Sequence, residues 1–168
     1  NYTVAKFTNM RANKRVIVEF ERVIGQVIVH HYIKNTTTPV EVADGIVAED
    51  EVKNGTEGTN YATKPKENLV GYEYVSSTDN TSGKYIDGTI EVIYYYRALK
   101  YKYFVNYYEK DTNNLIANQK VTDEIPYKTM INSSDEIIDI DGYVYDSVDK
   151  ESLLVRENEA ENVINIYY

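Results

Sequence analysis

The sequence predicts tandem small β-rich domains, and three observations predict them: an internal repeat, strand-like alternation and turn-rich gaps. Val, Ile, Thr and Tyr alternate with polar residues inside the apolar segments, while Asn, Asp, Gly, Ser and Thr fill the gaps, as strands and turns require. Three segments that end in aromatic residues look like one strand used three times: VIVEF (16–20), VIYYY (92–96) and INIYY (164–168). The last two end 72 positions apart, a period that fits a small domain and exceeds that of most solenoid repeats.

Other landmarks recur in the same order. VIVHHY (27–32) corresponds to YFVNYY (103–108), and each is followed by a polar turn. GYEYV (71–75) corresponds in the same way to GYVYD (142–146). Each repeat therefore has an opening strand, a turn, a variable middle, a Gly-Tyr strand and a closing aromatic strand.

This order divides the chain. We expect one module over residues 25–98 and a second over 99–168, joined at RALK (97–100), and the short junction favours an extended arrangement. Residues 1–24 match only the closing half of a repeat, so they are the C-terminal part of a preceding module or an extra hairpin.

Alternation also predicts which face of each closing strand is buried. Val92, Tyr94 and Tyr96 are assigned to the core because their counterparts in the other two segments are apolar throughout: Ile164, Ile166 and Tyr168, and Val16, Val18 and Phe20. Helix signals are few: single turns are candidates at 64–68 and at 133–137, where Ser133 or Ser134 could cap. The stretch 147–162 is expected to form a hairpin.

Composition and motifs exclude several classes of function. The formal net charge of -9 and the scattered Lys and Arg oppose binding to nucleic acid, and no apolar run is long enough to insert this segment into a membrane. The absence of cysteine removes disulfides, thiolate nucleophiles and Cys-based zinc sites. No nucleophile and base pair or phosphate loop can be argued, so we expect no enzyme and no cofactor.

Metal ligation is not favoured either. His30 and His31 are neighbours on a strand and should point to opposite faces, so they cannot readily hold one ion together. Asp139 and Asp141 would share a face, but the surrounding acidic stretch lacks the spacing of an EF-hand loop.

Four motifs together resemble the MucBP repeat, a family of mucin-binding-protein modules found in tandem on the surface of Gram-positive bacteria. They are the opening V-x-V-x-Y pattern, with His31 in the place of Tyr, and then GTEGTNY (55–61), GYEYV (71–75) and TIEVIYY (89–95). The second module keeps the opening strand, the Gly-Tyr pair and the closing strand. It has DEIPYKTMI (123–131) instead of the G-x-x-G-x-x-Y element.

The resemblance implies a mainly β, ubiquitin-like β-grasp module in which the first and last strands lie parallel and adjacent in the middle of the sheet. It also implies an extracellular, wall-anchored or secreted adhesin whose partner is host mucin or a glycan, or a spacer without a ligand of its own. The residues alone leave an immunoglobulin-like sandwich as an equal alternative.

The dense tyrosines raise the question of a binding platform. If opening and closing strands are neighbours, one face of the second module gathers aromatic rings flanked by amides, which suits stacking on a sugar and hydrogen bonding to its hydroxyls. The candidate glycan-binding residues are Tyr95, Phe104, Asn106, Tyr108, Asn165 and Tyr167. The competing interpretation is scaffolding, because a small module uses large aromatics to bury enough surface.

Overall fold

A computed structural model describes residues 17, 19–43 and 45–168, and it is mainly β. Val16 and Val18, two of the counterparts of the closing strand, and most of the segment 1–24 lie outside the described residues. Phe20, the third of these counterparts, is described and is 88% exposed. Residues 19–23 lie outside the strands that the structure describes.

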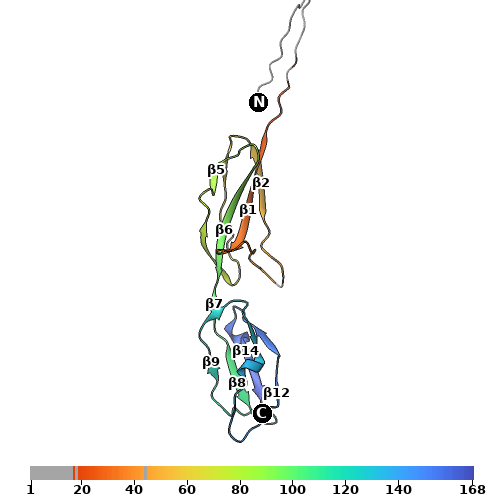
Figure 1. The fold of residues 1–168 in the computed structure, drawn as a ribbon, viewed down its shortest axis with the longest axis vertical. Helices are drawn as coiled ribbons and strands as arrows, with labels where there is room; N and C mark the ends of the chain where they lie inside the picture. The colour runs from red at the N-terminus through yellow and green to blue at the C-terminus, as the bar shows by residue number, and fades with distance from the viewer. Residues whose placement is uncertain (1–16, 18, 44) are drawn as a thin grey trace, which may run out of the picture.

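The first sheet has the strand order β2, β1, β6, β4 (Figure 1). Its strands are β1 (Ile24–Ile33), β2 (Glu51–Thr56), β4 (Tyr72–Ser77) and β6 (Thr89–Ala98). β1 and β6 are central and parallel, in register from Gln26 opposite Thr89 to Ile33 opposite Tyr96, and the edge strands are antiparallel to them. The expectation that the first and last strands lie parallel and adjacent is confirmed for this sheet.

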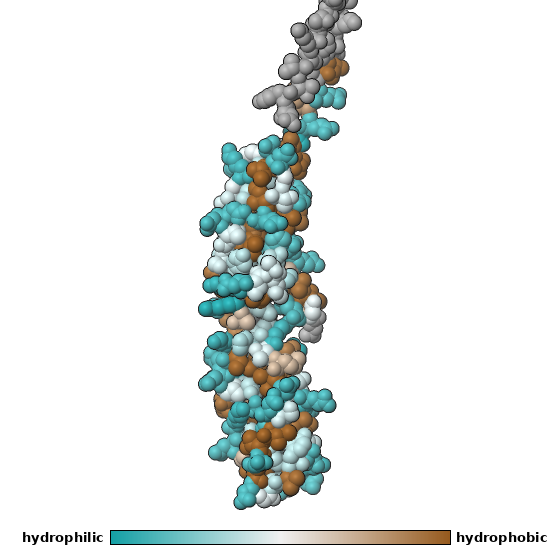
Figure 2. Space-filling view, viewed as in Figure 1, coloured by the Kyte–Doolittle hydropathy of each residue, from teal (hydrophilic) through white to brown (hydrophobic). Residues whose placement is uncertain are grey.

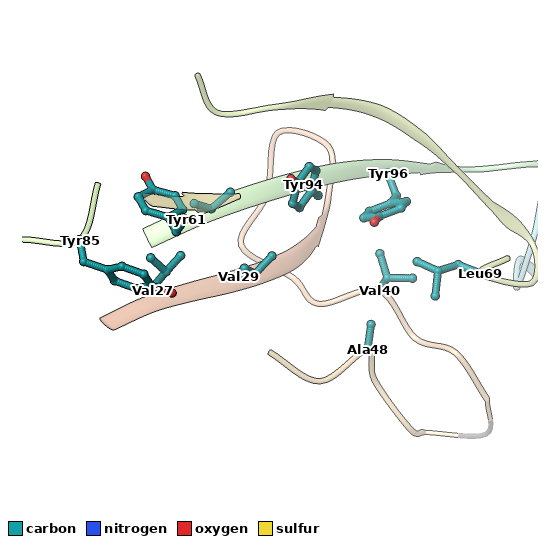
Figure 3. Packing of buried hydrophobic residues seen from close by; sticks show 10 residues of the cluster. Val27, Val29, Val40, Ala48, Tyr61, Leu69, Tyr85, Tyr94 and Tyr96 are labelled. Carbon is teal, nitrogen blue, oxygen red and sulfur yellow. The ribbon is translucent and has the colours of Figure 1, made fainter. Parts of the chain in front are cut away.

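The core lies on one face of this sheet. Val27, Val29, Val92, Tyr94 and Tyr96 are buried there, which confirms the predicted face of the closing strand. The chain between the two central strands covers them with Val40, Ala48, Tyr61, Leu69 and Tyr85 (Figure 3). Tyr61 belongs to β3 (Asn60–Ala62), which pairs with β5 (Ser82–Lys84).

The second sheet repeats this plan with shorter strands in the order β12, β14, β8, β9. They are β8 (Phe104–Tyr108), β9 (Lys120–Val121), β12 (Ser147–Val148) and β14 (Val163–Tyr167), and β8 and β14 are again central and parallel. β11 (Met130–Asn132) pairs with β13 (Ser152–Leu154), as β3 pairs with β5. A second, separate core contains Tyr103, Val105, Tyr107, Leu153, Ile164 and Ile166, with Tyr168 partly buried against it.

A clamp made by the closing tyrosine is the same in both sheets. The Tyr96 hydroxyl lies 2.8 Å from the backbone nitrogen of Lys66 and 3.3 Å from its carbonyl oxygen. The Tyr168 hydroxyl lies 3.2 Å and 2.7 Å from the same two atoms of Ile138. The repeat seen in the sequence therefore extends to single hydrogen bonds.

A tight turn also recurs in the segment 123–131, where the sequence of the second sheet lacks the G-x-x-G-x-x-Y element. The Thr59 amide and hydroxyl donate to the Thr56 carbonyl at 3.0 and 2.6 Å, and the Thr129 amide and hydroxyl donate to the Pro126 carbonyl at 3.1 and 2.7 Å. Gly58 takes φ +81° in the first turn, and Lys128 takes φ +61° in the second. The second sheet thus keeps the turn without the glycine, at a cost in strain, because this φ disfavours a residue with a Cβ.

The two sheets follow one another end to end (Figure 1). Of the predicted junction 97–100, Arg97 and Ala98 extend β6, while Lys100 begins β7 (Lys100–Tyr101), which pairs with β10 (Ile125–Pro126). Only Leu99 lies outside a strand between them. Hydrophobic and hydrophilic residues are interspersed along the face in view (Figure 2).

Three local expectations need correction or refinement. Residues 64–68 form no helix, because the Lys66 backbone is held by Tyr96 instead. The turn near 133–137 is confirmed as the 3₁₀ helix η1 (Ser133–Glu136), but its N-cap is Asn132 rather than a serine. Residues 147–162 form no hairpin: β12 and β13 pair with β14 and β11, and the 3₁₀ helix η2 (Glu159–Glu161) follows.

Candidate ligand-binding faces

The face of the second sheet opposite its core carries five of the six candidate residues. In the register of β8 and β14, Asn106 lies opposite Asn165 and Tyr108 lies opposite Tyr167, with Phe104 at the start of β8. All five side chains are half-buried. The neighbouring placement expected from the sequence is therefore observed; a role of these residues in binding stays a prediction. We call these five residues the amide face.

A row of hydrogen-bonded side chains crosses this face. Gln119 Nε2 donates to Asn106 Oδ1 at 2.8 Å, and Asn106 Nδ2 donates to Asn165 Oδ1 at 2.9 Å. Asn165 Nδ2 donates in turn to Asp149 Oδ2 at 3.0 Å, while Asp149 Oδ1 accepts the Asn165 backbone N–H at 2.9 Å. These bonds use one N–H and one lone pair of each asparagine amide, so each amide has a second N–H and a second lone pair for a ligand.

Aromatic rings lie on both sides of the amide row. Tyr108 and Tyr167 are stacked, with ring centroids 5.9 Å apart and planes 27° from parallel, and Phe104 lies two residues from Asn106 in the other direction. The arrangement offers oriented polar groups between flat apolar surfaces. This combination can stack on the apolar face of a sugar ring while hydrogen bonding to its hydroxyls.

Two residues of the row, Gln119 and Asp149, escaped the sequence analysis. Gln119 precedes the edge strand β9, and Asp149 follows the edge strand β12. Both edge strands have only two residues, which is too short for an alternating pattern to reveal the strands or their register. The available signal was the presence of polar residues beside each short strand. Polar residues are common in turns, so this signal does not single out Gln119 and Asp149.

Tyr95, the sixth candidate, lies apart from the amide face, so the six residues do not form one surface. It belongs to β6 of the first sheet, opposite Tyr32 of β1. There the His30 ring stacks on Tyr32 at 5.1 Å, and His30 Nδ1 lies 2.9 Å from Asp50 Oδ1. Partial burial, together with the charges of Asp50 and Glu91, raises the pKa of Tyr32.

Among protein families, the model of the MucBP domain matches residues 26–97. Residues 26–97 are a MucBP domain. The match covers nearly all of the first sheet, from Gln26 of β1 to Arg97 of β6. MucBP is a family of binding domains rather than of enzymes, and it occurs in mucin-binding surface proteins.

A search of curated proteins returned no match. Within the described part of the chain, no helix is long and apolar enough to cross a membrane.

Inside the MucBP domain, His31 is a core residue and His30 points to the opposite face, as the alternation predicts. His31 is fully buried, with Nδ1 3.1 Å from the Tyr96 hydroxyl and Nε2 3.6 Å from Glu51 Oε1. Burial lowers the pKa of His31, with a smaller contribution from the charge of Lys66. Burial also raises the pKa of Tyr96 to about 12.

The second core contains a different ionisable group. Glu136 of η1 is buried, and its Oε1 accepts a hydrogen bond from the Tyr103 hydroxyl at 2.7 Å. Its Oε2 lies 2.5 Å from the ammonium of Lys120, which is half-exposed. Burial, followed by the hydrogen bond to Glu136, raises the pKa of Tyr103. The group is paired and enclosed, so it contributes to the packing of the second core rather than to an open site.

Proposed function

We propose that this segment is a non-enzymatic part of a bacterial cell-surface adhesin and contributes to binding host mucin glycoprotein or its glycans. We further propose that residues 25–98 and 99–168 are two β-grasp modules of an extracellular, wall-attached Gram-positive protein, with residues 1–24 belonging to a preceding module. The MucBP match at 26–97 supports the mucin partner. The parallel central strands in both sheets support the β-grasp assignment.

The amide face is the single observation that carries the binding proposal. Its two asparagines are held in fixed orientations by Gln119 and Asp149, so a ligand that meets them need not order them first. Its stacked tyrosines expose flat surface at a low cost in conformational entropy. Glycans combine the two kinds of group that such a face recognises, ring C–H groups and hydroxyls.

The test measures retention of the chain on immobilised mucin. The double variant Tyr108→Ala and Tyr167→Ala removes the stacked pair from the amide face, and we expect about a tenfold loss of affinity. The matched control is Tyr32→Ala with Tyr95→Ala, which makes the same change on the first sheet. Equal binding by the amide-face variant and the unchanged chain, with circular dichroism showing that both are folded, would refute this site.

A second candidate function is a spacer, which the end-to-end arrangement of the two sheets favours (Figure 1). A module of about 70 residues has a radius of gyration of roughly 11 Å, so each would add about 30 to 40 Å of reach. If the full-length parent binds mucin and this segment does not, the spacer is the better assignment. Small-angle scattering that shows a compact particle would count against it.

A further inference from the structure

The contact between the two sheets shows how one sheet receives the next. The Leu99 amide donates to the Gly71 carbonyl at 2.8 Å, and the Tyr127 amide donates to the Leu99 carbonyl at 2.8 Å. A Cβ at Gly71 would lie 2.3 Å from the Tyr127 ring, so the ring packs directly on the glycine. The rings of Tyr72 and Tyr127 meet edge to face at 5.5 Å and 87°.

A charged residue completes this contact from the same turn. Lys128 Nζ lies 2.7 Å from Glu41 Oε1 and donates to the Ala43 carbonyl at 3.2 Å. Tyr127 and Lys128, presented on the turn 126–129, are thus two of the side chains by which the second sheet docks on the first. Val70 lines the hollow beside them.

The turn at Gly71 and Tyr72, on which Tyr127 packs, is called here the receiving turn. The second sheet has the same turn at its own far end, at Gly142 and Tyr143. The Tyr143 amide donates to the Ile140 carbonyl at 3.0 Å, as the Tyr72 amide donates to Leu69 at 3.0 Å, and Gly142 has φ +81° where Gly71 has +76°. The ring of Tyr145 meets that of Tyr168 edge to face at 6.3 Å, as Tyr74 meets Tyr96 at 6.1 Å. Gly142 and Tyr143 therefore correspond to Gly71 and Tyr72.

Within the described part of the chain, this second copy is uncovered. Apart from its chain neighbours, no described atom lies within 4 Å of the place where a Cβ of Gly142 would stand. Tyr143, Val144 and Tyr145 are 39%, 83% and 43% exposed, and Ile138 beside them is exposed as well. We call these four residues the distal patch. Of these four, Tyr143 is the one that differs from the covered copy, where Tyr72 is partly buried, whereas Tyr145 is about as exposed as Tyr74 at 46%.

We propose that the distal patch and Gly142 receive the opening end of a further module of this kind, through a turn that presents a tyrosine followed by a lysine. The covered copy at Gly71 and Tyr72 identifies the occupant. The tyrosine would pack on Gly142 and meet Tyr143 edge to face. This inference does not rest on mucin binding by either sheet.

The charge of the receiving turn fits such an occupant. The loop that supplies Glu41 and Ala43 has no counterpart in the second sheet, where the connection from Ile116 to Lys120 of β9 is much shorter. Asp141, however, stands in the place of Val70, the residue beside Lys128 in the first contact. The carboxylate of Asp141 takes over from Glu41 as the partner for the incoming lysine.

The experiment extends the chain at Tyr168 with a second copy of residues 97–168, whose turn is the one that docks on the first sheet. Nitration of tyrosines, followed by peptide mass spectrometry, reports the exposure of Tyr143. We expect the extension to slow nitration of Tyr143 several-fold. Tyr127→Ser, made in the added copy alone, should restore the rate, whereas Tyr127→Phe there should preserve the protection.

A second measurement uses the 168-residue chain alone. Tyr143→Ser should leave the melting temperature unchanged, whereas the matched variant Tyr72→Ser should lower it, because only Tyr72 is covered. Unchanged nitration of Tyr143 behind a folded added copy would overturn the proposal. So would an added copy that fails to fold behind Tyr168, or a loss of stability in Tyr143→Ser equal to that in Tyr72→Ser.

Discussion

The two sheets share their backbone devices and differ in the ionisable group that each buries. Both have a parallel central pair, a closing tyrosine that clamps one residue, and a tight turn with a positive φ. The first core encloses His31 beside Tyr96, and the second encloses Glu136 beside Tyr103. The same hydrogen-bonding scheme therefore recurs in both sheets around different buried polar groups, each next to a tyrosine hydroxyl.

Removing the hydroxyl of the closing tyrosine should produce the largest difference in stability between the two sheets. Tyr96→Phe leaves the buried His31 and the Lys66 amide without this partner, so we expect the first sheet to lose about 2 kcal/mol of stability. Tyr168→Phe removes a clamp in a more exposed place, and less than about 1 kcal/mol should be lost. Chemical denaturation of each variant measures both values. Equal losses would show that the two clamps are energetically the same.

Exchanging the turn residues should produce a smaller effect. Lys128→Gly relieves the positive φ and should stabilise the second sheet by up to about 1 kcal/mol, while Gly58→Lys should destabilise the first by about the same amount. Lys128→Gly also removes the contact with Glu41, so spin labels on the two sheets should show a broader distance distribution. A more stable second sheet with an unchanged distribution would show that Lys128 does not order the contact.

Acid should weaken the first sheet through His31. Its pKa in the folded chain is lowered, so the unfolded chain takes up the proton first as the pH falls below about 6.5. The stability that neutral His31 contributes is present above that pH and is lost below it. Thermal melts between about pH 7.5 and pH 5.5 should show this loss, and His31→Gln should reduce the slope. An equal slope in the variant would assign the pH dependence to other groups.

Much of the fold could be predicted because strand alternation and the internal repeat are both recognisable in the long central strands. Val92, Tyr94 and Tyr96 were assigned to the core on these grounds, and all three are buried. The neighbouring placement of Asn106 and Asn165 followed from one further assumption, that the opening and closing strands are adjacent.

The rest depended on contacts that a local pattern does not encode. A glycine rule marks the turn at Gly58, but Lys128 adopts the same turn because the surrounding hydrogen bonds hold it there. Gln119 and Asp149 complete the amide row from beside two-residue edge strands, which are too short for a period. Tyr95 was a candidate because it corresponds in the repeat to Tyr167, but it belongs to the first sheet, and Leu99 and β7 separate it from the amide face.

The parallel central pair also determines how the MucBP domain bears tension. The chain enters β1 at Ile24 and leaves β6 at Ala98, so its entry and exit lie at opposite ends of two adjacent strands. A pull through these two points slides β1 along β6 and strains their hydrogen bonds together, whereas antiparallel strands joined by a hairpin would open one bond at a time. We expect the domain to resist stretching along the axis of the chain more strongly than its small core would indicate.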